Sequence, residues 1–168
     1  MTAALDTDAI VCLRVGYGLS YTQWSYSVVS APETVDLNPL QQLLDRTKLE
    51  TGTHFPKLES VPLAGQYVVN VTNTGDRDAA DVVLGFISPP CAGTQGLPIQ
   101  SLFAFERVFV KAGQSTTVNL YPALTEMAFA NLEGERAAIA GEYTVRFGVA
   151  ETAEHGMGYV ESNLIARF

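Results

Sequence analysis

Apolar and polar residues alternate along much of the chain with a period of two, which is typical of β-strands that bury one face. The pattern is clearest at two places, where the inward residues are Tyr67, Val69 and Val71 in 66–72, and Tyr143, Val145, Phe147 and Val149 in 141–149. Asn70 falls on the opposite face of the first segment, so we expect it to face solvent. Further strands are predicted at 22–29, 80–88, 102–110, 115–120 and 162–168.

Two of these strands depart from simple alternation. In 80–88 the positions on both faces are apolar, so we expect this strand to be covered on both sides. In 102–110, Phe105 and Val108 are three residues apart and cannot share one face of a regular strand. This spacing predicts a bulge or a change of sheet near Glu106.

A helical pattern separates the first two strands. Asn38-Pro39 gives an N-cap followed by proline at the first helical position, and Leu40, Leu43 and Leu44 fall on one face, which predicts a helix over 38–49. We interpret 33–65 as an excursion between the strands that packs this leucine stripe onto the body. The alternative is a lid or a partner-binding arm, because long loops in compact domains are often functional.

The elements together predict an all-β Greek-key sandwich of about seven strands. We expect one sandwich domain over 14–168 and an irregular lead over 1–13, in which 9–13 could form a short buried strand. One helical turn is predicted at 124–129. Tyr143 lies where such a sandwich places a tyrosine corner, with its hydroxyl bonded to an upstream backbone group, although an ordinary strand tyrosine fits equally well.

The composition of the chain disfavours some classes of binding partner. The 168 residues suit one domain, and a net charge of -8 without any Lys/Arg cluster disfavours nucleic acid and anionic membrane surfaces. No apolar run approaches the roughly 18 residues of a membrane-spanning helix, and residues 1–8 lack the features of a signal peptide, so the compartment stays open. Asn70-Val71-Thr72 is a sequon, which makes Asn70 a candidate glycosylation site.

Side chains with metal or redox chemistry are few. His54 and His155 are isolated and share no metal-ligand spacing with Cys12 or Cys91, so we predict neither a metal site nor a cofactor. The two cysteines could form a disulfide in an oxidising compartment, or they could be two separate buried small apolar residues.

The most specific stretch is 14–27, in which Gly16-Tyr17-Gly18-Leu19-Ser20-Tyr21-Thr22 precedes Trp24 and Tyr26. It resembles the signature that opens the C-terminal fibronectin type III-like domain of family 3 glycoside hydrolases, the β-glucosidases and β-xylosidases. Other segments resemble motifs of the same domain in the same order: Val71-Thr72-Asn73-Thr74-Gly75, 82–90, Phe105-Glu106-Arg107-Val108, 112–115 and 140–145. Arg14-Val15 departs from the family pattern, which indicates a truncated start or an altered gene model.

The resemblance implies an immunoglobulin-like or fibronectin type III-like fold and no catalytic residue in this chain. A retaining glycosidase needs two carboxylates about 5 Å apart, and the family carries them in a barrel domain and an α/β domain. We therefore interpret four acidic residues as surface or turn charges: Glu106, Glu126, Glu133 and Glu135. The Pro89-Pro90, Gly93 and Leu97-Pro98 pattern resembles the β-xylosidase branch.

The resulting hypothesis is a non-catalytic domain that buttresses the catalytic domains of such an enzyme, covalently or non-covalently. The predicted interface residues are Tyr17, Leu19, Tyr21, Trp24, Phe105 and Arg107. A second hypothesis is a free-standing carbohydrate-binding or adhesion module, with oligosaccharide stacked on Trp24 and its neighbouring tyrosines. A third is a fragment of a split gene. Core or interface packing of these aromatics is the simpler reading.

Overall fold

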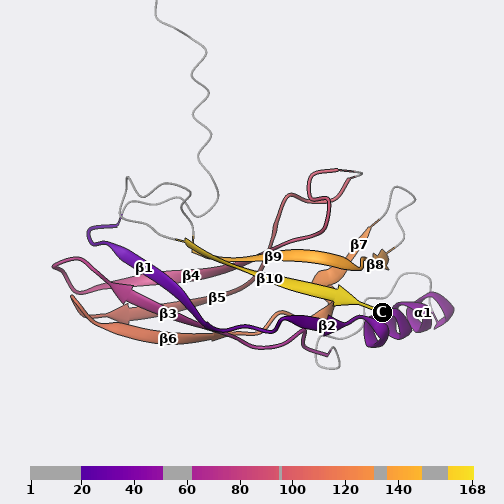
Figure 1. Cartoon of the computed structure of the whole chain (residues 1–168), viewed down its shortest axis with the longest axis horizontal. Helices are drawn as coiled ribbons and strands as arrows, with labels where there is room; N and C mark the ends of the chain where they lie inside the picture. Colours follow the sequence, from indigo (N-terminus) through magenta and orange to yellow (C-terminus); the bar gives the residue numbers. More distant parts are fainter. Residues whose placement is uncertain (1–19, 51–61, 95, 131–135, 149–158) are drawn as a thin grey trace, which may run out of the picture.

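The chain forms a long β-sandwich of two sheets (Figure 1). The computed structural model describes residues 20–50, 62–94, 96–130, 136–148 and 159–168. One sheet has three strands in the order β1-β3-β6, and the other has five in the order β2-β10-β9-β4-β5. The predicted all-β, immunoglobulin-like sandwich with one short helix is confirmed.

The three-stranded sheet is antiparallel throughout and consists of β1 (Trp24–Ser30), β3 (Tyr67–Asn73) and β6 (Ser115–Leu120). The five-stranded sheet consists of β2 (Thr34–Asp36), β10 (Tyr159–Arg167), β9 (Gly141–Gly148), β4 (Ala79–Ser88) and β5 (Ser101–Val110). The predicted strands agree with these bounds to within a few residues at their ends.

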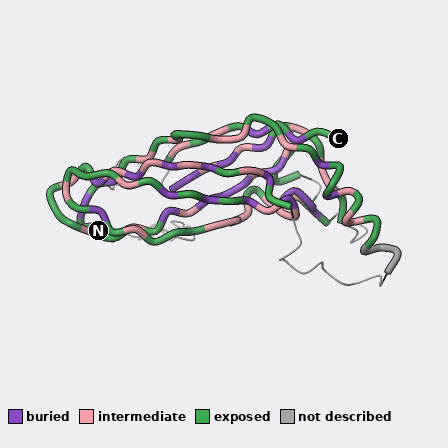
Figure 2. The backbone as a smooth tube through the Cα atoms, turned by 90° about the horizontal axis from the view of Figure 1, so that it is seen from below, coloured by how far each residue is buried: buried purple, intermediate pink, exposed green. Residues whose placement is uncertain are grey.

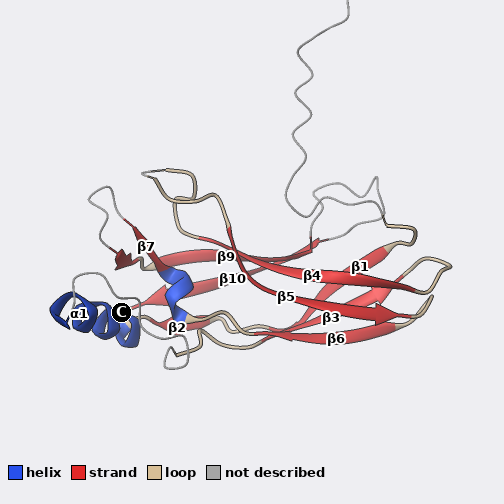
Figure 3. Ribbon diagram, turned by 180° about the vertical axis from the view of Figure 1, so that it is seen from behind, coloured by secondary structure: helices blue, strands red, loops and turns tan. Residues whose placement is uncertain are grey.

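The remaining elements lie towards one end of the sandwich (Figure 3). They are the helix α1 (Asn38–Glu50), the 3-10 turn η2 (Leu124–Met127) and a two-stranded sheet of β7 (Ala128–Ala130) and β8 (Arg136–Ala138). The helix and the helical turn were predicted, and the small sheet was not.

The segment between β1 and β3 carries the chain from one sheet to the other. After β1, the short β2 pairs in parallel with β10, and Leu37 N donates to Arg167 O at 2.7 Å. The helix α1 then begins beside the C-terminus (Figure 1), with Leu40 fully buried and Leu44 partly buried against the core. This part of the excursion therefore packs on the body through its leucines, as the sequence pattern predicted.

The core lies between the two sheets, where buried positions alternate with exposed ones along the strands (Figure 2). At its centre the Tyr67 ring lies 5.3 Å from the Phe147 ring and 6.4 Å from the Phe103 ring, measured between centroids. The largest fully buried side chains are Tyr67, Tyr143, Phe147, Leu37, Leu40, Ile87, Met127 and Leu164.

The irregularity predicted near Glu106 occurs instead at Phe103. The register between β4 and β5 shifts between Gly85 and Phe86, so that Phe103 is the extra residue of β5. Its ring lies over Gly85, where a Cβ would meet the ring at 2.7 Å. The position predicted near Glu106 was wrong, because β5 is regular there: Phe105 points outward and Val108 lies on the opposite face, against the core.

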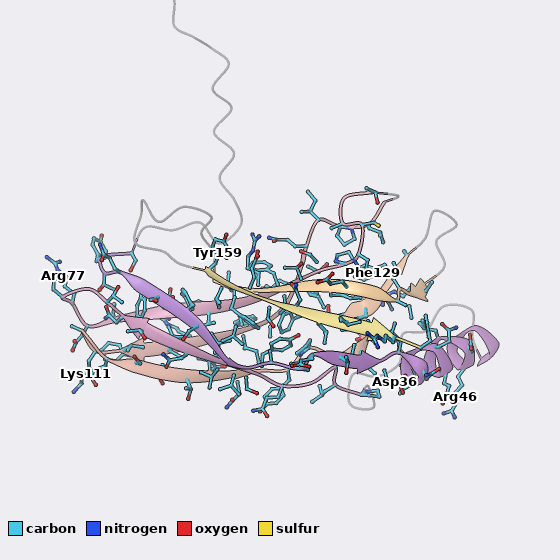
Figure 4. All side chains as sticks on the ribbon, in the orientation of Figure 1. Asp36, Arg46, Arg77, Lys111, Phe129 and Tyr159 are labelled. Carbon is cyan, nitrogen blue, oxygen red and sulfur yellow. The ribbon has the colours of Figure 1, made fainter. Side chains whose placement is uncertain are left out.

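One end of the sandwich is fastened by the fully buried side chain of Asn73. Its Oδ1 accepts from Thr22 Oγ1 at 2.6 Å and from Gly75 N at 3.1 Å, and its Nδ2 donates to Val110 O at 3.0 Å and to Arg77 O at 2.7 Å. The amide thus ties the start of β1, the end of β3 and the end of β5 together. The adjoining turns, which carry Arg77 and Lys111, lie at this end (Figure 4).

Gly75 is needed beside this amide for steric reasons. A Cβ at Gly75 would lie 2.1 Å from Thr22 Oγ1 and 2.9 Å from Gln23 N, which is inside van der Waals contact. The Asn73-Thr74-Gly75 turn and the Thr22 end of the opening signature are therefore two halves of one contact. This explains physically why two motifs far apart in the sequence occur together.

The predicted tyrosine corner is present. The Tyr143 hydroxyl donates to Ile139 O at 2.6 Å, four residues upstream. The equally buried Tyr67 differs, because its hydroxyl has no hydrogen-bond partner in the part of the chain that the structure describes.

We expect Asn73→Ala to lower the free energy of unfolding by about 3 kcal/mol, because it leaves the buried Val110 carbonyl and the Thr22 hydroxyl unpaired. Urea unfolding monitored by circular dichroism measures the effect. The control is Asn119→Ala. The exposed Asn119 side chain bonds only to that of Gln66 among the described residues, so its loss should change stability by less than about 0.5 kcal/mol. Equal effects of the two changes would refute the role of Asn73.

The two buried tyrosines should respond oppositely to loss of the hydroxyl. Tyr143→Phe removes the bond to Ile139 O and should cost about 1 to 2 kcal/mol, whereas Tyr67→Phe removes an unpaired buried hydroxyl and should be neutral or stabilising by about 1 kcal/mol. Thermal and urea unfolding of both variants provide the comparison. A cost for Tyr67→Phe as large as that for Tyr143→Phe would contradict this account.

Candidate functional site

The predicted interface residues near the start of the chain have different surroundings. Tyr17 and Leu19 lie outside the described residues. Tyr21 is 90% exposed, whereas Trp24 is only 5% exposed and donates from Nε1 to Ser20 Oγ at 3.0 Å. Of the roles that the sequence left open for Trp24, the structure places it in the core, which leaves little of its indole for a partner or a sugar.

Phe105 and Arg107 lie together on the outer face of β5, which is an edge strand of the five-stranded sheet. Opposite them on β4, Phe105 faces Leu84 and Arg107 faces Val82. Phe109 follows on the same face, because successive residues of a strand point to opposite faces. Phe105 is 68% exposed and Phe109 is 64% exposed.

This part of the sheet forms an apolar outer face, which we call the β4–β5 face. Its apolar members are Val82, Leu84, Phe86, Leu102, Phe105 and Phe109. The prediction that both faces of 80–88 are covered is therefore wrong at Val82, which is 38% exposed, although Phe86 is buried. The apolar pattern was read correctly, but nothing in the described chain covers this end of the face.

The outer face of the three-stranded sheet has the opposite character. Two cross-strand rows consist of small polar residues, namely Ser25, Thr72 and Ser115, and Ser27, Asn70 and Thr117. Hydroxyls bond along it, with Thr72 Oγ1 and Ser115 Oγ 2.8 Å apart. Asn70 thus points away from the core as predicted and is half-buried, with Nδ2 donating to Thr72 Oγ1 at 3.4 Å. Its glycosylation remains a prediction.

The charges on the outer face of the five-stranded sheet are arranged unevenly. On β9 and β10, Arg146 forms a salt bridge with Glu161 at 2.7 Å and lies 4.9 Å from the centre of the Tyr159 ring. Tyr159 lies at the start of β10 (Figure 4). Arg107 on β5 is exposed and makes no ion pair or side-chain hydrogen bond with any residue that the structure describes.

The acidic residues that the sequence singled out lie apart from one another. Glu106 is exposed on β5. Glu126 on η2 is half-buried, and its burial raises the pKa of the carboxyl, which the nearby Arg136 opposes. Glu133 and Glu135 lie outside the described residues, as do His54, His155, Cys12 and the predicted strand 9–13. Within the described ranges, no three acidic, histidine or cysteine side chains are grouped as a metal site.

Two further findings concern the described part of the chain. Cys91 is an exposed free thiol in the loop after β4, so of the two alternatives for the cysteines the buried apolar one is wrong for Cys91. Among the helices that the structure describes, none is both long and apolar enough to cross a membrane.

A phenol and a carboxylate meet in the space between the sheets. The Tyr26 hydroxyl on β1 donates to Asp81 Oδ2 on β4. Burial, followed by the charge of Asp81 and this hydrogen bond, raises the pKa of Tyr26 above its ordinary value. Burial also raises the pKa of Tyr67 and of Tyr143. The pair links the two sheets, and its partly buried position suits a structural role.

Sequence reasoning named Phe105 and Arg107 as interface candidates but did not name Phe109, Leu102 and Val82, which share the β4–β5 face with them. The signal was present, since strand 80–88 is apolar on both faces. We expected both faces of that strand to be covered, and so did not expect the outer face to be exposed at Val82.

A family model for fibronectin type III-like domains matches residues 81–150. The chain carries a fibronectin type III-like domain. Over 146 residues it is 30% identical to β-D-xylosidase 1 of Arabidopsis thaliana, covering 82% of this chain and 19% of that enzyme. Over 152 residues it is 28% identical to probable β-glucosidase D of Emericella nidulans, covering 88% of this chain and 17% of that protein.

The solved structures agree on the fold. A family 3 β-glucosidase of Bifidobacterium adolescentis superposes with a TM-score of 0.56 and 24% identity, covering 89% of this chain and 18% of that enzyme. The domain is thus homologous to the C-terminal region of family 3 glycoside hydrolases, and it spans less than a fifth of the relatives that it matches.

Raised tyrosine pKa values predict sensitivity of this domain to alkali. Above pH 10 or so, these buried tyrosines ionise in the unfolded chain before they do in the folded one. Their contribution to stability is therefore constant below that pH and is lost as pH rises. Each such tyrosine should contribute about 1.4 kcal/mol per pH unit, and Tyr67→Phe should remove one such contribution.

Urea unfolding at a series of alkaline pH values measures this slope. Tyr21→Phe is the matched control, because the side chain is almost fully exposed and its loss should leave the slope unchanged. If stability did not depend on pH between about 10 and 12, the buried tyrosines would not be held neutral as described.

Proposed function

We propose that this chain is a non-catalytic accessory domain that buttresses the catalytic domains of a family 3 glycoside hydrolase. The observation that carries the proposal is the extent of the match. About four-fifths of the chain aligns with relatives of which it covers less than a fifth. In such an enzyme the chain corresponds to one terminal domain beside a much larger remainder, in which the family resemblance puts the two catalytic carboxylates.

The fold suits a supporting role. Side-chain bonds tie its parts together: Asn73 at the end of β3 bonds to Thr22 and to Val110 of β5, and Tyr26 joins the two sheets through Asp81. A rigid body with one exposed apolar face is the type of structure that holds neighbouring domains in a fixed arrangement.

We further propose that the parent enzyme is β-xylosidase-like and acts in the breakdown of plant-type polysaccharides or oligosaccharides. Support comes from the two Arabidopsis relatives named as β-D-xylosidases, each 30% identical to this chain. The fungal relatives named as β-glucosidases make aryl glucosides the competing substrate class.

The alternative of a free-standing carbohydrate-binding module rested on Trp24 as a stacking platform. The 5% exposure of that indole removes this support. Tyr21 near Trp24 is exposed but lacks an exposed indole beside it. The aromatic pair on β5 flanks an arginine and suits a protein partner at least as well.

The test replaces the matched region of the Arabidopsis β-D-xylosidase 1 with this full chain. The hybrid enzyme should hydrolyse an aryl xyloside and melt as one cooperative unit, whereas the isolated chain should hydrolyse neither aryl xyloside nor aryl glucoside. If the parent is β-xylosidase-like, a hybrid built on the Emericella β-glucosidase D should be less stable than the Arabidopsis hybrid.

Asn73→Ala in the hybrid serves as the control, since it weakens this domain without touching the catalytic domains. Turnover by the isolated chain that a single substitution in it abolishes would overturn the accessory role. So would a hybrid no more active or stable than the relative with its matched region deleted.

A further inference from the structure

The two outer faces of the sandwich indicate which side of the domain is covered in its working state. An antiparallel sheet with one face on the core usually presents polar residues on the other. The three-stranded sheet follows this rule with its rows of serine, threonine and asparagine. The β4–β5 face breaks it, because the outward positions of β4 are apolar in succession and those of β5 are apolar except at Arg107.

The edge position of β5 makes this departure more costly for an isolated domain. Edge strands of soluble proteins usually carry charges or prolines that prevent association. β5 carries the exposed charges Glu106 and Arg107, but it also exposes Phe105 and Phe109. Leu102 near its start adds a third large apolar side chain on the face of Phe105 and Phe109. Contiguous apolar surface of this kind marks a protein interface.

Arg107 specifies the chemistry of the surface that fits this face. It lies between Phe105 and Phe109 on the same side of β5, about 7 Å from each along the strand. It faces Val82 on β4 and no acidic residue. Covering the two phenylalanines would also take the guanidinium out of water, which is unfavourable unless the partner supplies an opposite charge.

We infer that the β4–β5 face is the docking surface for the catalytic domains, and that the surface it meets is apolar around a carboxylate that pairs with Arg107. This inference rests on the proposed function for the identity of the partner. It excludes two other surfaces of the domain from the main contact, namely the hydroxyl-rich outer face of the three-stranded sheet and the start of β1 at Trp24. Phe105 and Phe109 are the apolar anchors, and Arg107 determines register.

The hybrid enzyme with the Arabidopsis catalytic domains provides the assay, and amide hydrogen exchange of residues 101–110 provides the readout. These amides should exchange about tenfold or more slowly in the hybrid than in the isolated chain. Phe105→Ser and Arg107→Glu should each abolish most of that protection, and Arg107→Lys, which keeps the charge, should retain part of it.

Matched controls come from the same chain. Val29→Ser changes an exposed apolar residue of β1, and Arg46→Glu reverses an exposed charge on α1, and both should leave exchange at 101–110 unchanged. All four residues are exposed, so the variants should fold, and circular dichroism of each isolated chain verifies this. Raising the salt concentration should weaken protection in the wild-type hybrid more than in Arg107→Gln.

The outcomes separate the two proposals. If the wild-type hybrid is active and stable but Phe105→Ser and Arg107→Glu behave as the controls do, the docking face is wrong and the accessory function stands. If the wild-type hybrid is no better than the truncated relative, both fail. If the isolated chain dimerises and Phe105→Ser alone makes it monomeric, a second copy occupies the face and the inference is overturned.

Discussion

The buried amide of Asn73 is the constraint on which the sandwich depends. It has two donor hydrogens and one acceptor oxygen, and each of them has a partner on a different segment of the chain. Because the site is fully buried, neither a carboxylate nor an aliphatic side chain could replace it without leaving an unpaired group. The signature at the start of the chain and the Asn-Thr-Gly turn are specified together by this geometry.

Several elements could be predicted because their signals are local. The alternation of Tyr67, Val69 and Val71 fixes which side of β3 meets the core, and Asn38-Pro39 marks where α1 begins. The tyrosine corner followed from the place of Tyr143 in a Greek-key pattern. β2 could not be found in this way, since three residues carry no period and its partner strand lies at the other end of the chain.

The candidate site was predicted in part, for a different physical reason. Period-two patterns show that β4 and β5 have two faces, but they do not say which face another surface covers. Phe105 and Arg107 were named because they belong to a motif read as an interface, whereas Phe109 belongs to no motif and Val82 belongs to one that was read as a core strand. Trp24 shows the converse: it belongs to the signature, but it is buried opposite Asn73 in the β1–β3 register and bonds to Ser20.

The two sheets thus divide the work of the domain. The three-stranded sheet has one face in the core and an outer face rich in hydroxyl groups, which can bond to water. This sheet therefore needs no partner surface. The five-stranded sheet grades across its outer face, from the Arg146 and Glu161 pair on β9 and β10 to apolar residues on β4 and β5. Only the β4–β5 end of that face gains stability when another surface covers it, so the domain has one preferred side for contact with a neighbour.

The parallel pairing of β2 with β10 bears on how the chain is made. Residue 34 leaves the ribosome long before residue 165, which it pairs with, so β2 waits unpaired while β3 to β9 are synthesised. The local antiparallel pair of β4 and β5 can form early, but the β2–β10 edge closes last because its loop-closure entropy is the largest in the sheet. Until β10 has paired, the leucines of α1 have no complete sandwich to pack against. The domain is therefore most prone to association just before β10 pairs.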